Sequence, residues 1–163
     1  MKNLAVLFIL SFISFSTQAQ RIIEKNINYK NQEINIEVPF ASEIELKTWD
    51  KNTVYVKADL TMSEGKYLDL YELNIEESND RIEVISNAEP LFKEWQKDYR
   101  RNYPGKAEDS DKKPKNNNVT YSGDQIIITD EMEYTFNYVI YIPEGAEVKI
   151  SSINGNLYSE VIT

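Results

Sequence analysis

The stretch YIPEGAEVKISSINGNLYSEV, residues 141–161, decides which fold the chain is expected to adopt. A Pro-Glu-Gly turn at 143–145 is followed by VKIS at 148–151, in which apolar and polar residues alternate, and then by an Asn-Gly turn at 154–155. Alternation with a period of two is typical of a strand with one buried face, and Pro-x-Gly and Asn-Gly are turn signals. The stretch therefore predicts three short strands joined by tight turns.

The same alternation recurs along most of the chain. It is found at residues 34–38, 44–46, 54–56, 73–75, 82–84, 126–128 and 132–142. Many short strands with few helical signals predict an all-β fold. A stack of two sheets that carries a single helical or disordered insertion fits this pattern.

The insertion is predicted at residues 87–124, between two strands. Its first part, LFKEWQKDYRR at 91–101, has the spacing of an amphipathic helix. The apolar residues that lie four apart on one face of that helix are Leu91, Trp95 and Tyr99. The second part, 102–118, has very few apolar residues and several helix breakers, which predicts a mobile loop.

The first 19 residues have the features of a secretory signal peptide. Lys2 precedes an apolar run at 4–15, and Thr-Gln-Ala at 17–19 fits a small-residue cleavage site. The run of about 12 residues is shorter than the roughly 18 needed to span a bilayer, and no second such run follows. We therefore expect one β-rich domain at 20–163 in the periplasm, on the cell surface or secreted. The chain has no cysteine, so we expect neither disulfides nor a lipoprotein anchor.

The charge and the composition of the chain exclude several classes of function. The chain carries a net charge of −9, and losing Lys2 with the signal makes it one unit more negative, which argues against binding to nucleic acid. The absence of histidine and cysteine excludes a Ser-His-Asp triad, a cysteine nucleophile and a His/Cys zinc site within one chain. These features predict a non-enzymatic protein without a cofactor.

Two other functions stay open. One is a polysaccharide hydrolase or lyase that uses a pair of carboxylates. The acids considered for it are Glu76, Glu77, Asp130, Glu131 and Glu133. The other is a periplasmic carrier of lipid or lipoprotein.

The chain also contains an internal similarity. VPFASEIELKTWDKN at 38–52 aligns with IPEGAEVKISSINGN at 142–156, with the proline, one glutamate and one asparagine identical. Each copy reads as an extended segment, a proline-containing turn and a half-buried strand. The chain is therefore expected to use one strand-turn-strand unit at both ends.

The same segments carry a resemblance to a family. EIELKTWDKNTVYVKADL at 43–60 and VIYIPEGAEVKISSINGNLY at 139–158 resemble two landmarks of an uncharacterised family of exported bacterial proteins described as adhesins. Members of that family are thought to continue into short repeated strands that stack as a β-solenoid. The resemblance implies an adhesin-like envelope protein, and we expect a solenoid that is shortened at its C-terminus.

Five residues are candidates for a surface that binds a ligand or partner: Trp49, Asp50, Trp95, Tyr99 and Tyr141. An exposed tryptophan beside a carboxylate could stack on a sugar ring while the carboxylate binds hydroxyls. The alternative is that Trp49 covers the end of the core and Asp50 forms the following turn. Tyrosine is also a common strand residue with no role in binding.

The expected partner is an envelope protein or a glycan. The predicted surface consists of rigid strands together with the insertion. An edge strand is predicted near 157–161, with backbone groups free to pair with another chain by β-augmentation. That chain would be either a second copy, giving an edge-strand homodimer, or a client protein.

Overall fold

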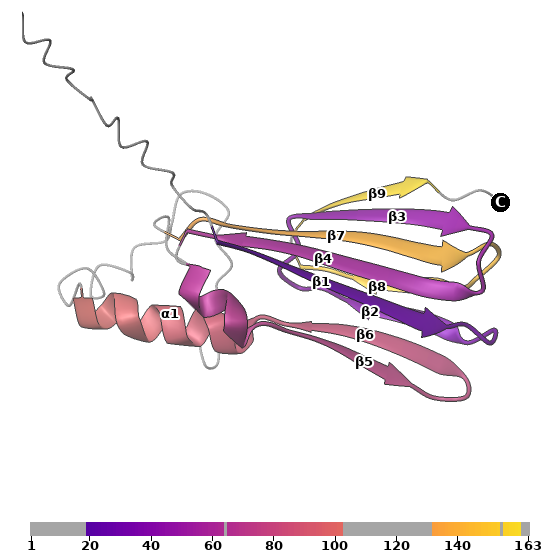
Figure 1. Cartoon of the computed structure of the whole chain (residues 1–163), viewed down its shortest axis with the longest axis horizontal. Helices are drawn as coiled ribbons and strands as arrows, with labels where there is room; N and C mark the ends of the chain where they lie inside the picture. The colour runs from indigo at the N-terminus through magenta and orange to yellow at the C-terminus, as the bar shows by residue number, and fades with distance from the viewer. Residues whose placement is uncertain (1–18, 64, 103–131, 154, 161–163) are drawn as a thin grey trace, which may run out of the picture.

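The computed structural model describes residues 19–63, 65–102, 132–153 and 155–160. Two β-sheets lie in two layers, with a helix at one end (Figure 1). In chain order the elements are β1 (Ala19–Asn28), β2 (Glu33–Glu37), β3 (Glu43–Trp49), β4 (Thr53–Met62), the 3-10 helix η1 (Gly65–Leu70), β5 (Glu72–Glu77), β6 (Arg81–Asn87), α1 (Glu89–Asn102), β7 (Tyr134–Pro143), β8 (Val148–Ser151) and β9 (Asn156–Glu160).

Both sheets mix parallel and antiparallel pairing. The five-stranded sheet has the order β1-β4-β7-β3-β9, in which the β1/β4 and β4/β7 pairs are antiparallel and the β7/β3 and β3/β9 pairs are parallel. The four-stranded sheet has the order β5-β6-β2-β8, with the first pair antiparallel and the other two parallel. The predicted all-β fold is confirmed as two stacked, open sheets.

The core lies between the sheets and follows the alternation in the sequence. In β4, Val54, Val56, Ala58, Leu60 and Met62 are buried, while the residues between them are partly exposed. The four-stranded sheet contributes its own buried rows from β2 and β6. The alternation predicted at 54–56 placed Val54 and Val56 correctly, because successive strand residues point to opposite faces, and the structure extends the buried row to Met62.

The sequence pattern did not predict strand β1. The core-facing positions of β1 include Arg21 and Lys25, which hides the alternation. The Arg21 guanidinium is satisfied because it donates hydrogen bonds to the carbonyl oxygens of Leu68 and, at 2.9 Å, of Tyr71. An edge strand tolerates such residues because its inner face is only partly covered.

The predicted helix is confirmed and begins two residues earlier than expected, at Glu89. Leu91, Phe92 and Trp95 are buried, and the Phe92 ring lies 4.7 Å from the ring of Phe40 and 5.2 Å from that of Tyr134. The helix therefore closes one end of the sandwich. The loop predicted at 102–118 lies outside the described residues from 103 onward, as do the strand predicted at 126–128 and almost all of the signal peptide.

Each of the two similar segments connects a strand of one sheet to a strand of the other sheet, and the two connections run in opposite directions. The first runs from β2 in the four-stranded sheet to β3 in the five-stranded sheet, and the second runs from β7 to β8 in the reverse direction. The strands that align in sequence do not pair with each other. Instead β3 lies between β7 and β9, and β2 pairs with β8.

The turn before β9 depends on Gly155. Its φ is 111°, and a Cβ at this position would lie 2.4 Å from the carbonyl oxygen of Ala41. Only glycine avoids both the backbone strain and the overlap. This close approach lets the Asn156 N–H donate to the Ser42 carbonyl, which starts the β3/β9 pairing.

Candidate functional site

Three aromatic side chains lie side by side on the outer face of the five-stranded sheet. Tyr55, Tyr141 and Trp49 come from the neighbouring strands β4, β7 and β3. The Trp49 ring is stacked on Tyr141, with centroids 4.9 Å apart, and the Tyr55 ring lies 6.0 Å from Tyr141. We call these three residues the aromatic row.

Strand alternation and register build the aromatic row. Tyr55 lies between the buried Val54 and Val56, so its ring must point outward, and it is directly opposite Tyr141 across the β4/β7 pair. The Trp49 indole N–H donates to the Thr53 carbonyl at 2.8 Å, which fixes the ring over the β3–β4 turn. All three aromatic side chains remain partly exposed.

Charged groups border the aromatic row. Lys47 forms an ion pair with Glu45 at 2.8 Å, and this hydrogen bond raises the pKa of Lys47. The ammonium group of Lys51 lies 4.5 Å from the centre of the Trp49 ring. The pKa of Tyr55 is raised, first by burial and then by a hydrogen bond with Glu24. Aromatic surface next to ammonium and carboxylate groups is suited to a ligand with an apolar face and polar edges.

The structure separates the five predicted residues into two groups. Trp49 and Tyr141 stack on each other, and Asp50 is exposed in the adjoining turn. Trp95 and Tyr99 stack on each other at 5.0 Å on α1. Strands β3 and β7 run away from α1, so the two groups are at opposite ends of the sandwich (Figure 1).

The assignment of Trp95 to a binding surface was wrong. Its side chain is 4% exposed and belongs to the core, with Tyr99 packed against it. Residues four apart on one face of an amphipathic helix point toward the core, so the same spacing already indicated burial. Tyr55, in contrast, was overlooked, although the Val-Tyr-Val alternation shows that it faces outward.

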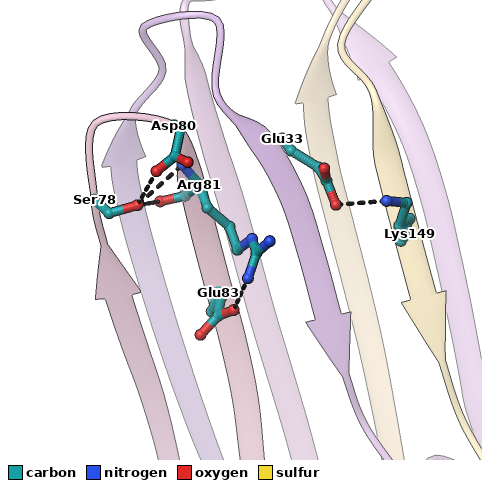
Figure 2. A network of polar contacts seen from close by, with 6 residues as sticks. All are labelled: Glu33, Ser78, Asp80, Arg81, Glu83 and Lys149. Atoms are coloured by element: carbon teal, nitrogen blue, oxygen red, sulfur yellow. Dashed lines mark hydrogen bonds and ion pairs between the residues drawn. The ribbon is translucent and has the colours of Figure 1, made fainter.

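A second polar site lies at the tip of the β5–β6 hairpin. An open depression of about 300 Å³ is lined by Glu76, Glu77, Ser78, Asp80, Arg81 and Glu83. Figure 2 shows the Ser78 hydroxyl accepting from the Arg81 N–H at 3.1 Å and the Arg81 guanidinium bound to Glu83 at 3.1 Å. On the same sheet Lys149 binds Glu33 at 2.7 Å (Figure 2), which lowers the pKa of Glu33.

Two carboxylates in this depression are directly opposite each other. Glu76 of β5 is the cross-strand partner of Glu83 of β6, while Glu77 is paired with Lys30 at 3.0 Å. Of the other acids considered, Glu133 is exposed, and Asp130 and Glu131 lie outside the described residues. Within the described ranges, no three acidic side chains are grouped so that they could hold a metal ion.

Comparisons with family models, with curated proteins and with solved structures found no match for this chain. In the part of the chain that the structure describes, no helix has the length and apolar character needed to cross a bilayer.

Proposed function

We propose that this chain is an exported, non-enzymatic binding protein of the bacterial envelope, and that the aromatic row binds glycan. The observation that carries the proposal is the stacked and partly exposed Trp49–Tyr141 pair, extended by Tyr55. A protein interior normally takes up such large apolar side chains, so three of them together on an outer sheet face favour a binding role.

The sugar would stack against the Trp49 ring. The exposed Lys51 ammonium lies over that ring, so the incoming sugar displaces it, and the freed ammonium can then bind a hydroxyl or carboxylate of the same glycan. Lys47 is the second cation beside the row, 5.9 Å from the Tyr141 ring. Because Lys47 is already paired with Glu45, Lys51 supplies the ammonium group that favours a glycan containing an acidic sugar.

The parallel strand pairs support the adhesin-like interpretation. Strands β2 and β3 stack in parallel on β8 and β9, with turns that connect the two sheets. A β-solenoid repeats this step many times. We propose that these strands are the beginning of the solenoid implied by the resemblance, and that the rigid outer face presents the aromatic row.

Binding of neutral and uronic-acid polysaccharides, measured by calorimetry, tests this function. We expect Trp49→Ala and Tyr141→Ala to abolish binding. Ile22→Ala is the control, because Ile22 is a half-exposed apolar residue on the same sheet that belongs neither to the aromatic row nor to strand β9. Equal loss in all three variants, or no binding to any glycan by the wild type, contradicts the proposal. Native mass spectrometry that reveals bound lipid would favour a carrier instead.

The Glu76–Glu83 pair keeps a hydrolase as the second candidate. Directly opposed residues have Cβ atoms about 5 Å apart, close to the carboxylate spacing of retaining glycosidases. The depression is open, and Arg81 already binds Glu83. New reducing ends that form with the wild type and not with Glu76→Gln would establish this alternative.

A further inference from the structure

One edge of the sandwich exposes both backbone and apolar side chains. Strand β9 is the last strand of the five-stranded sheet (Figure 1). All of its residues are exposed. Leu157 and Tyr158 are 53% and 56% exposed, so β9 presents one large exposed apolar side chain on each face of the sheet. An uncovered edge of this kind is a template for pairing with another strand.

The other three edge strands are protected by charge. The charged residues are Arg21, Glu24 and Lys25 in β1, Glu72, Glu76 and Glu77 in β5, and Lys149 in the short β8. Charged residues on an edge oppose edge-to-edge association. Strand β9 carries a single charge, Glu160, at its last position. The four edges therefore differ, and β9 alone among them carries no charged residue before its last position.

The residues of β9 alternate between those whose backbone groups face β3 and those whose backbone groups face the open edge. The Asn156 N–H bonds to Ser42, so Asn156 and every second residue after it face β3. Consecutive strand residues direct their backbone groups to opposite sides, so Leu157 and Ser159 present theirs to the open edge. An added antiparallel strand must therefore place residues with unpaired backbone groups opposite Leu157 and Ser159.

We infer that β9 pairs with β9 of a second copy of this chain, antiparallel, with Tyr158 on the two-fold axis. In this register Leu157 faces Ser159 of the second copy, so residues with free backbone groups meet and exchange hydrogen bonds. The two Tyr158 side chains form an aromatic cross-strand pair. Glu160 faces Asn156, which avoids contact between like charges.

The corresponding edge of the four-stranded sheet does not fit a second copy. Self-pairing of β8 about its centre would place Lys149 opposite Lys149, and like charges directly opposite destabilise a sheet. Lys149 is also held by Glu33 at 2.7 Å. The asymmetry between β8 and β9 therefore selects a dimer that extends the five-stranded sheet.

Substitution to lysine tests the dimer by sedimentation velocity. Tyr158→Lys sets two ammonium groups against each other and should leave only monomer. Ile22→Lys is the control, because Ile22 is a half-exposed apolar residue on the edge strand at the other side of the same sheet. It should remain a dimer. Wild-type protein that is monomeric at its highest attainable concentration overturns the inference, whether or not glycan binding is found.

Cysteine cross-linking tests the register, since the chain has no cysteine of its own. Across the axis the two Tyr158 Cα atoms would be about 4.5 Å apart, within disulfide reach, so Tyr158→Cys should cross-link on oxidation. The two Asn156 Cα atoms would be about 13 Å apart, so Asn156→Cys should not. Cross-linking of Asn156→Cys as fast as Tyr158→Cys would contradict the register.

Discussion

The hydroxyl oxygens of Tyr71 and Tyr138 lie 2.9 Å apart inside the core, and the Ser86 hydroxyl lies 3.0 Å from that of Tyr138. All three side chains are buried, and they come from both sheets and the segment before β5. Buried hydroxyls cost free energy unless they are hydrogen-bonded. The hydroxyls of Tyr71, Tyr138 and Ser86 form hydrogen bonds with one another. Because these bonds cross between the sheets, the network favours one orientation of the two sheets.

Replacing Tyr138 by phenylalanine should lower the free energy of unfolding by about 1–2 kcal/mol, because its hydroxyl serves two buried partners. Urea unfolding measures the change. Tyr134→Phe is the control, since it removes a hydroxyl outside the network, and it should have a smaller effect. Equal losses in the two variants would show that the network adds nothing to stability.

Stability should also fall in alkali. Burial raises the pKa values of Tyr71, Tyr134 and Tyr138 above the ordinary value of about 10. Below pH 10 these tyrosines are protonated in both states, whereas above it the unfolded chain loses protons first. The unfolding free energy therefore falls as pH rises above about 10, by about 1.4 kcal/mol per pH unit for each fully shifted tyrosine.

Urea unfolding between neutral pH and strong alkali measures this slope. The slope should become shallower in Tyr138→Phe, because one of the shifted groups is gone. A slope that is the same in the variant and the wild type would mean that Tyr138 does not titrate differently in the folded and unfolded chains.

The two tryptophans should respond differently to substitution. Trp95→Ala should lower the unfolding free energy by about 3–5 kcal/mol, because it removes a buried side chain and leaves a cavity. Trp49→Ala loses mainly the stacking on Tyr141, worth about 1 kcal/mol. Urea unfolding of both variants checks this difference. A comparable loss at Trp49 would make it a structural residue that covers the end of the core and would weaken the glycan proposal.

Sequence pattern predicted local features and failed at contacts between distant segments. Alternation placed Val54 and Val56 on the core face of β4, and the helix at 91–101 was predicted from its spacing. Strand β1 was missed because Arg21 and Lys25 occupy core-facing positions. The aromatic row could not be predicted as a unit, since its members meet only when β7 lies between β4 and β3.

With the exception of β1, the sequence by itself determined where most of the described strands lie and which side of them is apolar, because a pleated chain alternates its side chains with a fixed period. The tertiary structure decided which strands became neighbours. Pairing of Glu43 with Asn137 and with Asn156 joins segments that are far apart in the chain, and no local pattern encodes that choice. It also decided which edge was left open, because β9 is an edge only once β3 has taken its place beside β7.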